Sequence, residues 1–147
     1  MKTSYLTETL TLLLLLAASA VALTLIQPPA SLSFLAWVAL VPFILAALLQ
    51  IKLWKLLLAA YLVAAAYWLG NLWWVAPITV AGWLAFCLYT ALLWPALVLA
   101  IRFAAKISLP LLLAVPVLFV GAERLQGFIL GGFFWRLLAH SQFQNVA

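Results

Sequence analysis

Residues that could carry out chemistry are few in this chain of 147 residues. There are two acidic residues, one histidine and one cysteine. One histidine and one cysteine cannot hold a metal ion by themselves, and this set cannot supply a nucleophile with its own base and acid. The sequence also has no glycine-rich phosphate loop followed by lysine and serine or threonine. We therefore expect no metal site, no cofactor and no catalytic residue in these residues.

Glu123 is the residue whose chemistry stands out. It lies near the end of an apolar stretch and is followed by Arg124. A carboxylate in such a place is costly unless it is paired, protonated or in contact with water. Three interpretations stay open: Glu123 is solvated in the headgroup region, it accepts backbone N–H groups and so orders the loop that follows, or it takes part in proton relay or transport.

Cys87 lies between Phe86 and Leu88 in the middle of another apolar stretch. Apolar surroundings disfavour the thiolate, which is the reactive form of cysteine. We therefore interpret Cys87 as a packing residue.

The composition restricts the class of protein that holds these residues. Hydrophobic residues make up 71% of the chain and charged residues 6%, and the mean hydropathy is +1.33. A soluble domain needs a far more polar surface, and a disordered chain has much less apolar surface to bury. A lone cysteine excludes a disulfide scaffold. The composition therefore indicates an integral membrane protein.

Uncharged stretches divide the chain into segments long enough to cross a bilayer. Roughly 20 apolar residues in a helix span the hydrocarbon core. The pattern predicts an all-α integral membrane protein with about five transmembrane helices in a single domain, 1–147. We place the helices at 6–26, 31–49, 56–72, 83–101 and 108–126, followed by a glycine- and aromatic-rich tail over 127–147.

Prolines and small residues refine these helices. We expect Pro42 and Pro95 to kink the helices that contain them, whereas Pro110 falls near a helix start, where proline is tolerated. The segment from Trp73 to Trp83 is predicted to be either an interfacial loop or a re-entrant segment. A small-residue face on the third helix should permit close helix contact. Its residues are Ala59, Ala60, Ala64, Ala65 and Ala66.

The first helix has a second interpretation. Lys2, the leucine run and the small residues at 18–20 together resemble a secretory signal with a cleavage site. The apolar run continues past these small residues to Ile26, which favours a retained helix. Whether residues 1–20 are removed stays open.

The net charge of +5 predicts an orientation. Positive residues in short loops stay in the cytoplasm, and five spans place most of them on one side. The basic residues are scattered over different loops, so they do not indicate nucleic-acid binding. We expect a cytoplasmic N-terminus and a periplasmic C-terminal tail. Lys2, Lys52, Lys55, Arg102 and Lys106 fall on the first side, and Arg124 and Arg136 on the second.

Three stretches carry a resemblance to a known family. They are 28–42, which reads PPASLSFLAWVALVP; 70–75, which reads GNLWWV; and 123–142, which holds ERLQG, GFFW and AHSQ in that order. In these stretches the sequence resembles the N-terminal membrane domain of apolipoprotein N-acyltransferase. Gln126 stands where the family usually has arginine, and Phe134 where it usually has proline.

The resemblance implies a reaction in which a phospholipid acyl chain passes to the N-terminal amine of a diacylated lipoprotein. The family performs it with a nitrilase-like domain that carries a Glu-Lys-Cys triad, and no stretch of these 147 residues matches that domain. The resemblance therefore implies a membrane scaffold that is truncated and inactive alone. The implied partners are membrane phospholipid and, only if the catalytic domain is supplied, the lipoprotein. The implied location is the bacterial inner membrane.

The candidate structural or substrate-lining residues come from the motifs. Two alternatives to the scaffold remain: a stand-alone small membrane protein that binds lipid or a partner protein, and a small transporter subunit. The near absence of ionisable residues in the first four spans counts against transport. The candidates are Trp73, Trp74, Glu123, Gly127, Gly132, Trp135, His140, Ser141 and Gln142.

Overall fold

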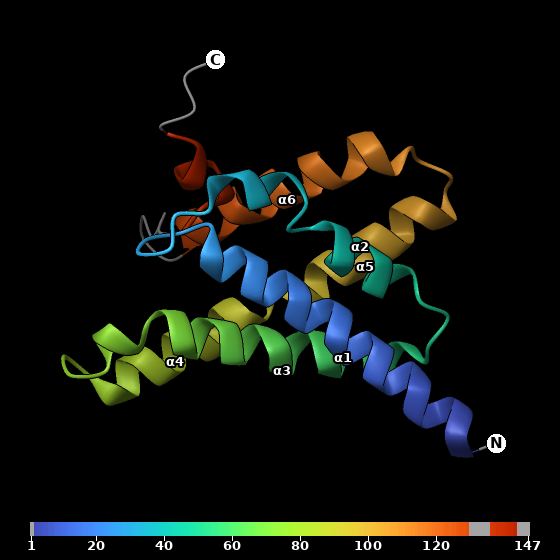
Figure 1. Cartoon of the computed structure of the whole chain (residues 1–147), viewed down its shortest axis with the longest axis horizontal. Helices are drawn as coiled ribbons and strands as arrows, with labels where there is room; N and C mark the ends of the chain where they lie inside the picture. Colours follow the sequence, from blue (N-terminus) through green and yellow to red (C-terminus); the bar gives the residue numbers. More distant parts are fainter. Residues whose placement is uncertain (1, 130–135, 144–147) are drawn as a thin grey trace.

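Helices make up the regular structure in the residues that the computed structural model describes, 2–129 and 136–143. Four helical segments are long and apolar enough to cross a membrane: 7–25, 53–71, 80–106 and 111–129. This confirms the all-helical membrane fold (Figure 1). The elements are α1 (Lys2–Leu25), η1 (Ser33–Trp37), α2 (Val41–Leu48), α3 (Leu53–Asn71), η2 (Trp73–Val75), α4 (Val80–Ala91), α5 (Leu93–Lys106), α6 (Leu111–Ile129) and η3 (Leu138–Gln142).

The second expected span is divided. Its first part is the short 3-10 helix η1, and its second part is α2, with only eight residues. Such a helix is about 12 Å long, less than half of the hydrocarbon core. Pro42 lies in the first turn of α2, where its missing N–H is harmless, so the expected kink inside a longer helix was wrong. The next N–H, that of Phe43, donates to Ser19 Oγ of α1 at 2.8 Å.

The fourth expected span is broken at Leu92, between α4 and α5, as the proline in this segment suggested. Pro95 has no N–H to donate to the preceding turn. Near the break, Thr90 Oγ1 donates to the carbonyls of Phe86 and Cys87, at 3.0 and 3.1 Å. The two helices still form one apolar segment of 27 residues.

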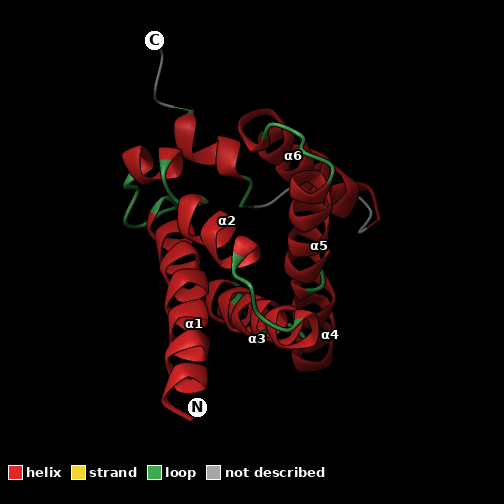
Figure 2. Cartoon of the chain, turned by 90° about the vertical axis from the view of Figure 1, so that its right-hand side faces the viewer, coloured by secondary structure: helices red, strands yellow, loops and turns green. Residues whose placement is uncertain are grey.

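Helix α3 packs against several other helices. It contacts α1, α4 and α5, and α2 also contacts α1 and α5 (Figure 2). Ala59, Ala60, Ala64 and Ala65 are buried, as expected for a small-residue face. Ala66 is exposed, because the helical repeat turns it away from that face.

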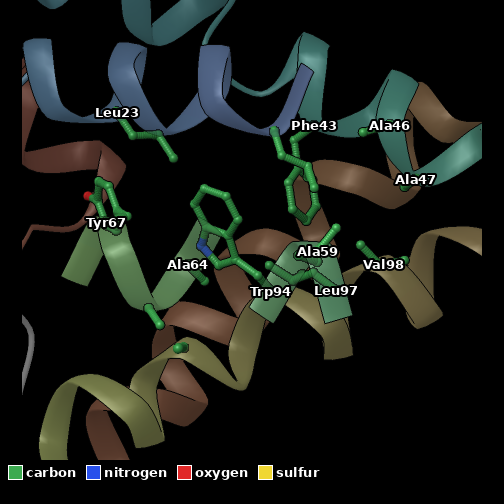
Figure 3. Close-up of a cluster of buried hydrophobic side chains, with 14 of the residues drawn as sticks. Leu23, Phe43, Ala46, Ala47, Ala59, Ala64, Tyr67, Trp94, Leu97 and Val98 are labelled. Atoms are coloured by element: carbon green, nitrogen blue, oxygen red, sulfur yellow. The ribbon is translucent and has the colours of Figure 1, made fainter. Parts of the chain in front are cut away.

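Aromatic side chains fill the space that the alanines leave. The rings of Phe43 and Trp94 meet edge to face with centroids 5.3 Å apart, and Tyr67 lies 5.8 Å from Trp94. These rings come from α2, α5 and α3, so one cluster joins three helices (Figure 3). Aromatic pairs of this kind contribute about 1 kcal/mol beyond the area they bury.

The bundle has two ends of different character. At the cap end, α1, α3 and α6 finish, and η1, η2 and η3 lie there (Figure 1). At the opposite, basic end, α2 and α5 finish and α3 and α6 begin. The basic end holds Lys52, Lys55, Arg102 and Lys106, so the fold brings together residues that were expected on one side. The assignment of that side to the cytoplasm stays a prediction.

The connection between α3 and α4 is a short surface loop. Its 3-10 turn η2 leaves Trp73 and Trp74 68% and 45% exposed. Thr79 then begins α4, since its Oγ1 accepts the N–H of Gly82 at 3.2 Å. Residues 80–83 of the predicted segment 73–83 belong to α4, and the interfacial or re-entrant position of the rest stays a prediction.

Candidate functional site

The C-terminal segment 136–143, here called the cap segment, lies at the cap end against η1 and α6. Gln142 Nε2 donates to the carbonyl of Ser33 at 2.8 Å and to Ser141 Oγ at 2.9 Å. Ser141 is buried, and its hydroxyl donates to the carbonyl of Leu138 at 2.8 Å. These two predicted residues therefore connect the end of the chain to a segment more than 100 residues away.

Glu123 holds the other side of the cap segment. Its Oε1 accepts the backbone N–H of Leu138 at 2.9 Å. The side chain is half-buried rather than fully solvated. This is the contact that a loop-ordering carboxylate requires, and a hydrogen bond to an ionised carboxylate is stronger than one between neutral groups.

Sequence reasoning missed Gln27 as a site residue. It is buried, and its Nε2 donates to the carbonyl of Leu137 at 3.1 Å. In the sequence Gln27 lies between the apolar run that ends at Ile26 and the prolines Pro28 and Pro29. A polar side chain at the end of an apolar run was the available signal, because such a group needs a partner when it is buried.

Asn71 was also missed. Its Nδ2 donates to Thr24 Oγ1 at 3.0 Å and to the carbonyl of Tyr67 at 2.8 Å. These contacts join the last turns of α1 and α3 at the cap end. The ends of α1, α3 and α6 are therefore all tied together near the cap segment.

An apolar trough runs beside the cap segment, between η1–α2 and α6. It consists of two adjoining hollows of about 310 and 230 Å³, which share Ala36, Trp37, Phe119, Val120 and Leu138. The larger hollow extends to Leu111 and Leu112 at the start of α6. The smaller one ends at Glu123 and Gln142, so the trough has one polar end. Both hollows open to the outside of the bundle.

The remaining predicted residues lie in different places. His140 is exposed, and its backbone N–H donates to Leu137. Gly127 is buried within α6. Trp73 and Trp74 line neither of the hollows described above. Gly132 and Trp135 lie outside the described residues, and the expected tail begins later than predicted because α6 continues to Ile129.

The chemistry available at this site is limited. Among residues 2–129 and 136–143, no group of three or more histidine, cysteine or acidic residues could hold a metal ion. Cys87 is fully buried in α4, as expected for a packing residue. The arrangement therefore offers an apolar trough with a polar end.

Comparison with known proteins identifies the family. The family model described as the apolipoprotein N-acyltransferase N-terminal domain matches residues 19–147. No curated protein and no solved structure matches the chain. The family match covers most of the chain, including the trough and the cap segment. The chain therefore belongs to the family of the apolipoprotein N-acyltransferase N-terminal domain.

Proposed function

We propose that this chain is the membrane scaffold of an apolipoprotein N-acyltransferase in the bacterial inner membrane, and that it holds the phospholipid donor. In this proposal one acyl chain lies in the trough between η1–α2 and α6. The transfer of the acyl group to a lipoprotein amine is carried out by a separate nitrilase-like domain. No residue described here is assigned a catalytic role.

The trough is the observation that carries the proposal. From Leu111 to Glu123 it follows thirteen residues of α6, whose twelve rises amount to about 18 Å of helix. One leaflet of the hydrocarbon core is about 15 Å thick, so the trough is as long as one acyl chain. Its walls are apolar over this length, and only its end at Glu123 and Gln142 is polar. That polarity matches a lipid, whose headgroup stays at the interface.

The orientation predicted from the positive charges agrees with the same proposal. With the basic end in the cytoplasm, the polar end of the trough lies at the periplasmic surface. The ester bonds of a phospholipid in the outer leaflet lie at that depth. A catalytic domain above the cap end would reach them without extracting the lipid from the membrane.

Lipid occupancy tests the trough directly. The chain is purified in mild detergent, and bound phospholipid is counted by native mass spectrometry. Val120 lines both hollows, so Val120→Trp should remove most of the bound lipid. Val117 is exposed on the same helix and lines neither hollow, so Val117→Trp is the matched control. Equal lipid retention in both variants would contradict the proposal.

An activity assay tests whether acyl transfer requires the nitrilase-like domain. The chain alone, and the chain mixed with a purified nitrilase-like domain of an N-acyltransferase, are incubated with phospholipid and a diacylated lipopeptide. We expect N-acylated product only in the mixture. Product formed by the chain alone would show that the scaffold role is wrong.

A further inference from the structure

A second, smaller cavity lies inside the bundle at the cap end, behind the wall of the trough. Its volume is about 40 Å³. Aromatic and aliphatic side chains of α1, α3, α5 and α6 form most of its wall. Glu123, Gln126 and Arg136 also line it, and Tyr67 adds a hydroxyl group. Polar groups that line a cavity inside a membrane bundle need hydrogen-bond partners.

Arg136 presents unused donors in this region. Its Nε and Nη2 atoms are buried and have no hydrogen-bond partner among the described residues. The guanidinium carbon lies 5.9 Å from the centre of the Tyr67 ring, which fixes the group at the cavity wall. Nε and Nη2 form one edge of the guanidinium, the edge that donates two parallel hydrogen bonds. Burying these donors without acceptors carries a large desolvation penalty.

Glu123 supplies acceptors to the same cavity. One of its oxygens, Oε1, accepts the Leu138 N–H, and a carboxylate can accept several hydrogen bonds. The carboxylate would repel an anion, so a phosphate or carboxylate ligand for Arg136 is excluded by charge. A neutral molecule that accepts from Arg136 and donates to Glu123 satisfies both groups.

Water is the molecule that fits. A buried water needs roughly 10–15 Å³ of such space and two to four polar partners. The cavity of about 40 Å³ has room for about three waters by this measure. A water oxygen can accept the N–H groups of Arg136 while its own hydrogens are donated to Glu123 or to the Gln126 side-chain oxygen.

We propose that this cavity is a water-binding site in which bound water bridges the guanidinium of Arg136 to the carboxylate of Glu123. The bridge holds the start of the cap segment on α6. Phe119, Glu123 and Leu138 line both this cavity and the trough, so the water site supports the trough wall from behind. The inference rests on protein polar groups alone and does not depend on lipid binding.

Radiolytic labelling detects such water. X-ray pulses generate hydroxyl radicals from bound water, and the radicals modify the side chains beside it. Tyr67 lines the cavity, whereas Phe43 is comparably buried and does not line it. We expect Tyr67 to be modified at least fivefold faster than Phe43 in the intact protein. Equal rates would show a dry cavity and overturn the proposal.

A double-mutant cycle tests the bridge between the two charges. Glu123→Gln and Arg136→Gln are made singly and together, and the unfolding equilibrium is measured in detergent. We expect the two changes to be coupled, with the double variant at least fivefold more stable than additive effects predict. Arg124 is exposed and does not line the cavity, so Arg124→Gln with Glu123→Gln should be additive.

The two measurements together separate the alternatives. Coupling without labelling of Tyr67 indicates a direct ion pair, which overturns the water site. Labelling without coupling shows water that does not bridge the charges, which overturns the bridge. If the variants do not fold, the labelling rates of the unaltered protein still decide whether the cavity holds water.

Discussion

The two ends of the bundle hold their connecting segments in different ways. At the basic end one side chain, Arg102, donates to the carbonyls of Ala47, Leu49 and Ile51. At the cap end several side chains each make one or two hydrogen bonds to the cap segment or from it. At the basic end one cation therefore binds three carbonyls, whereas the cap end uses carboxylate, amide and hydroxyl groups for its contacts.

The two ends differ because different backbone groups need hydrogen-bond partners at each of them. Helix α2 finishes at the basic end, and the last carbonyls of a helix are unpaired and carry partial negative charge. A guanidinium with five donors suits several clustered carbonyls. At the cap end the cap segment must attach to elements from α1 to α6, and its donors and acceptors point in several directions. Separate polar side chains meet that need better than one cation.

Arg102→Met should have the largest effect. It removes the partner of three carbonyls, so we expect a loss of about 3 kcal/mol in the free energy of unfolding. Reversible denaturation in detergent measures this value. Lys106→Met is the control, because Lys106 is exposed one turn later on the same helix. Equal stability of the two variants would mean that Arg102 serves only as a positive charge that sets the orientation of the chain in the membrane.

Glu123→Ala should have the second largest effect. It leaves the Leu138 N–H without its carboxylate acceptor, and we expect a loss of about 2 kcal/mol. Exposed Arg124 offers the control, Arg124→Ala, which we expect to change stability little. If Glu123→Ala is as destabilising as Arg102→Met, the cap end also depends on one residue and the contrast between the ends fails.

Helix positions were predictable from the sequence to a large extent, and side-chain partners were not. Long apolar runs bounded by charge located α1, α3 and α6 to within a few residues. Pro42 was misjudged because a proline has the same sequence signature inside a helix and in its first turn. Arg102 could be interpreted only as an inside charge, since its three carbonyls belong to a turn about 50 residues earlier.

The candidate site shows the same limit. Glu123 was found as a carboxylate near the end of an apolar stretch, and Ser141 and Gln142 were found through a sequence motif. Gln27 and the trough were not found, since both depend on segments that meet only in the folded chain. The local sequence pattern locates the helices. Contacts between residues about 110 positions apart can be identified only in the folded structure.

Gln142→Ala should have a smaller effect than either charged residue. The change removes hydrogen bonds to the Ser33 carbonyl and to Ser141 Oγ. Because these bonds join neutral groups, we expect a loss of about 1 kcal/mol. The same denaturation experiment checks it. His140→Ala, at an exposed neighbour, should leave stability unchanged, and a larger loss there than at Gln142 would contradict the assignment.

Gln27→Met should lower the free energy of unfolding least of the four changes, and its effect should be confined to the cap segment. Methionine keeps the length of the side chain but cannot donate to the Leu137 carbonyl, so one neutral hydrogen bond is lost, about 1 kcal/mol or less. If the cap end divides its task among several groups, Glu123 and Gln142 still hold the cap segment, and only its first residues loosen. Hydrogen exchange should then rise at 137–140 and stay unchanged at the end of α1, two residues before Gln27. Exchange that rises equally across the whole chain would mean that Gln27 supports global stability, and the two ends would then be more alike than their contacts suggest.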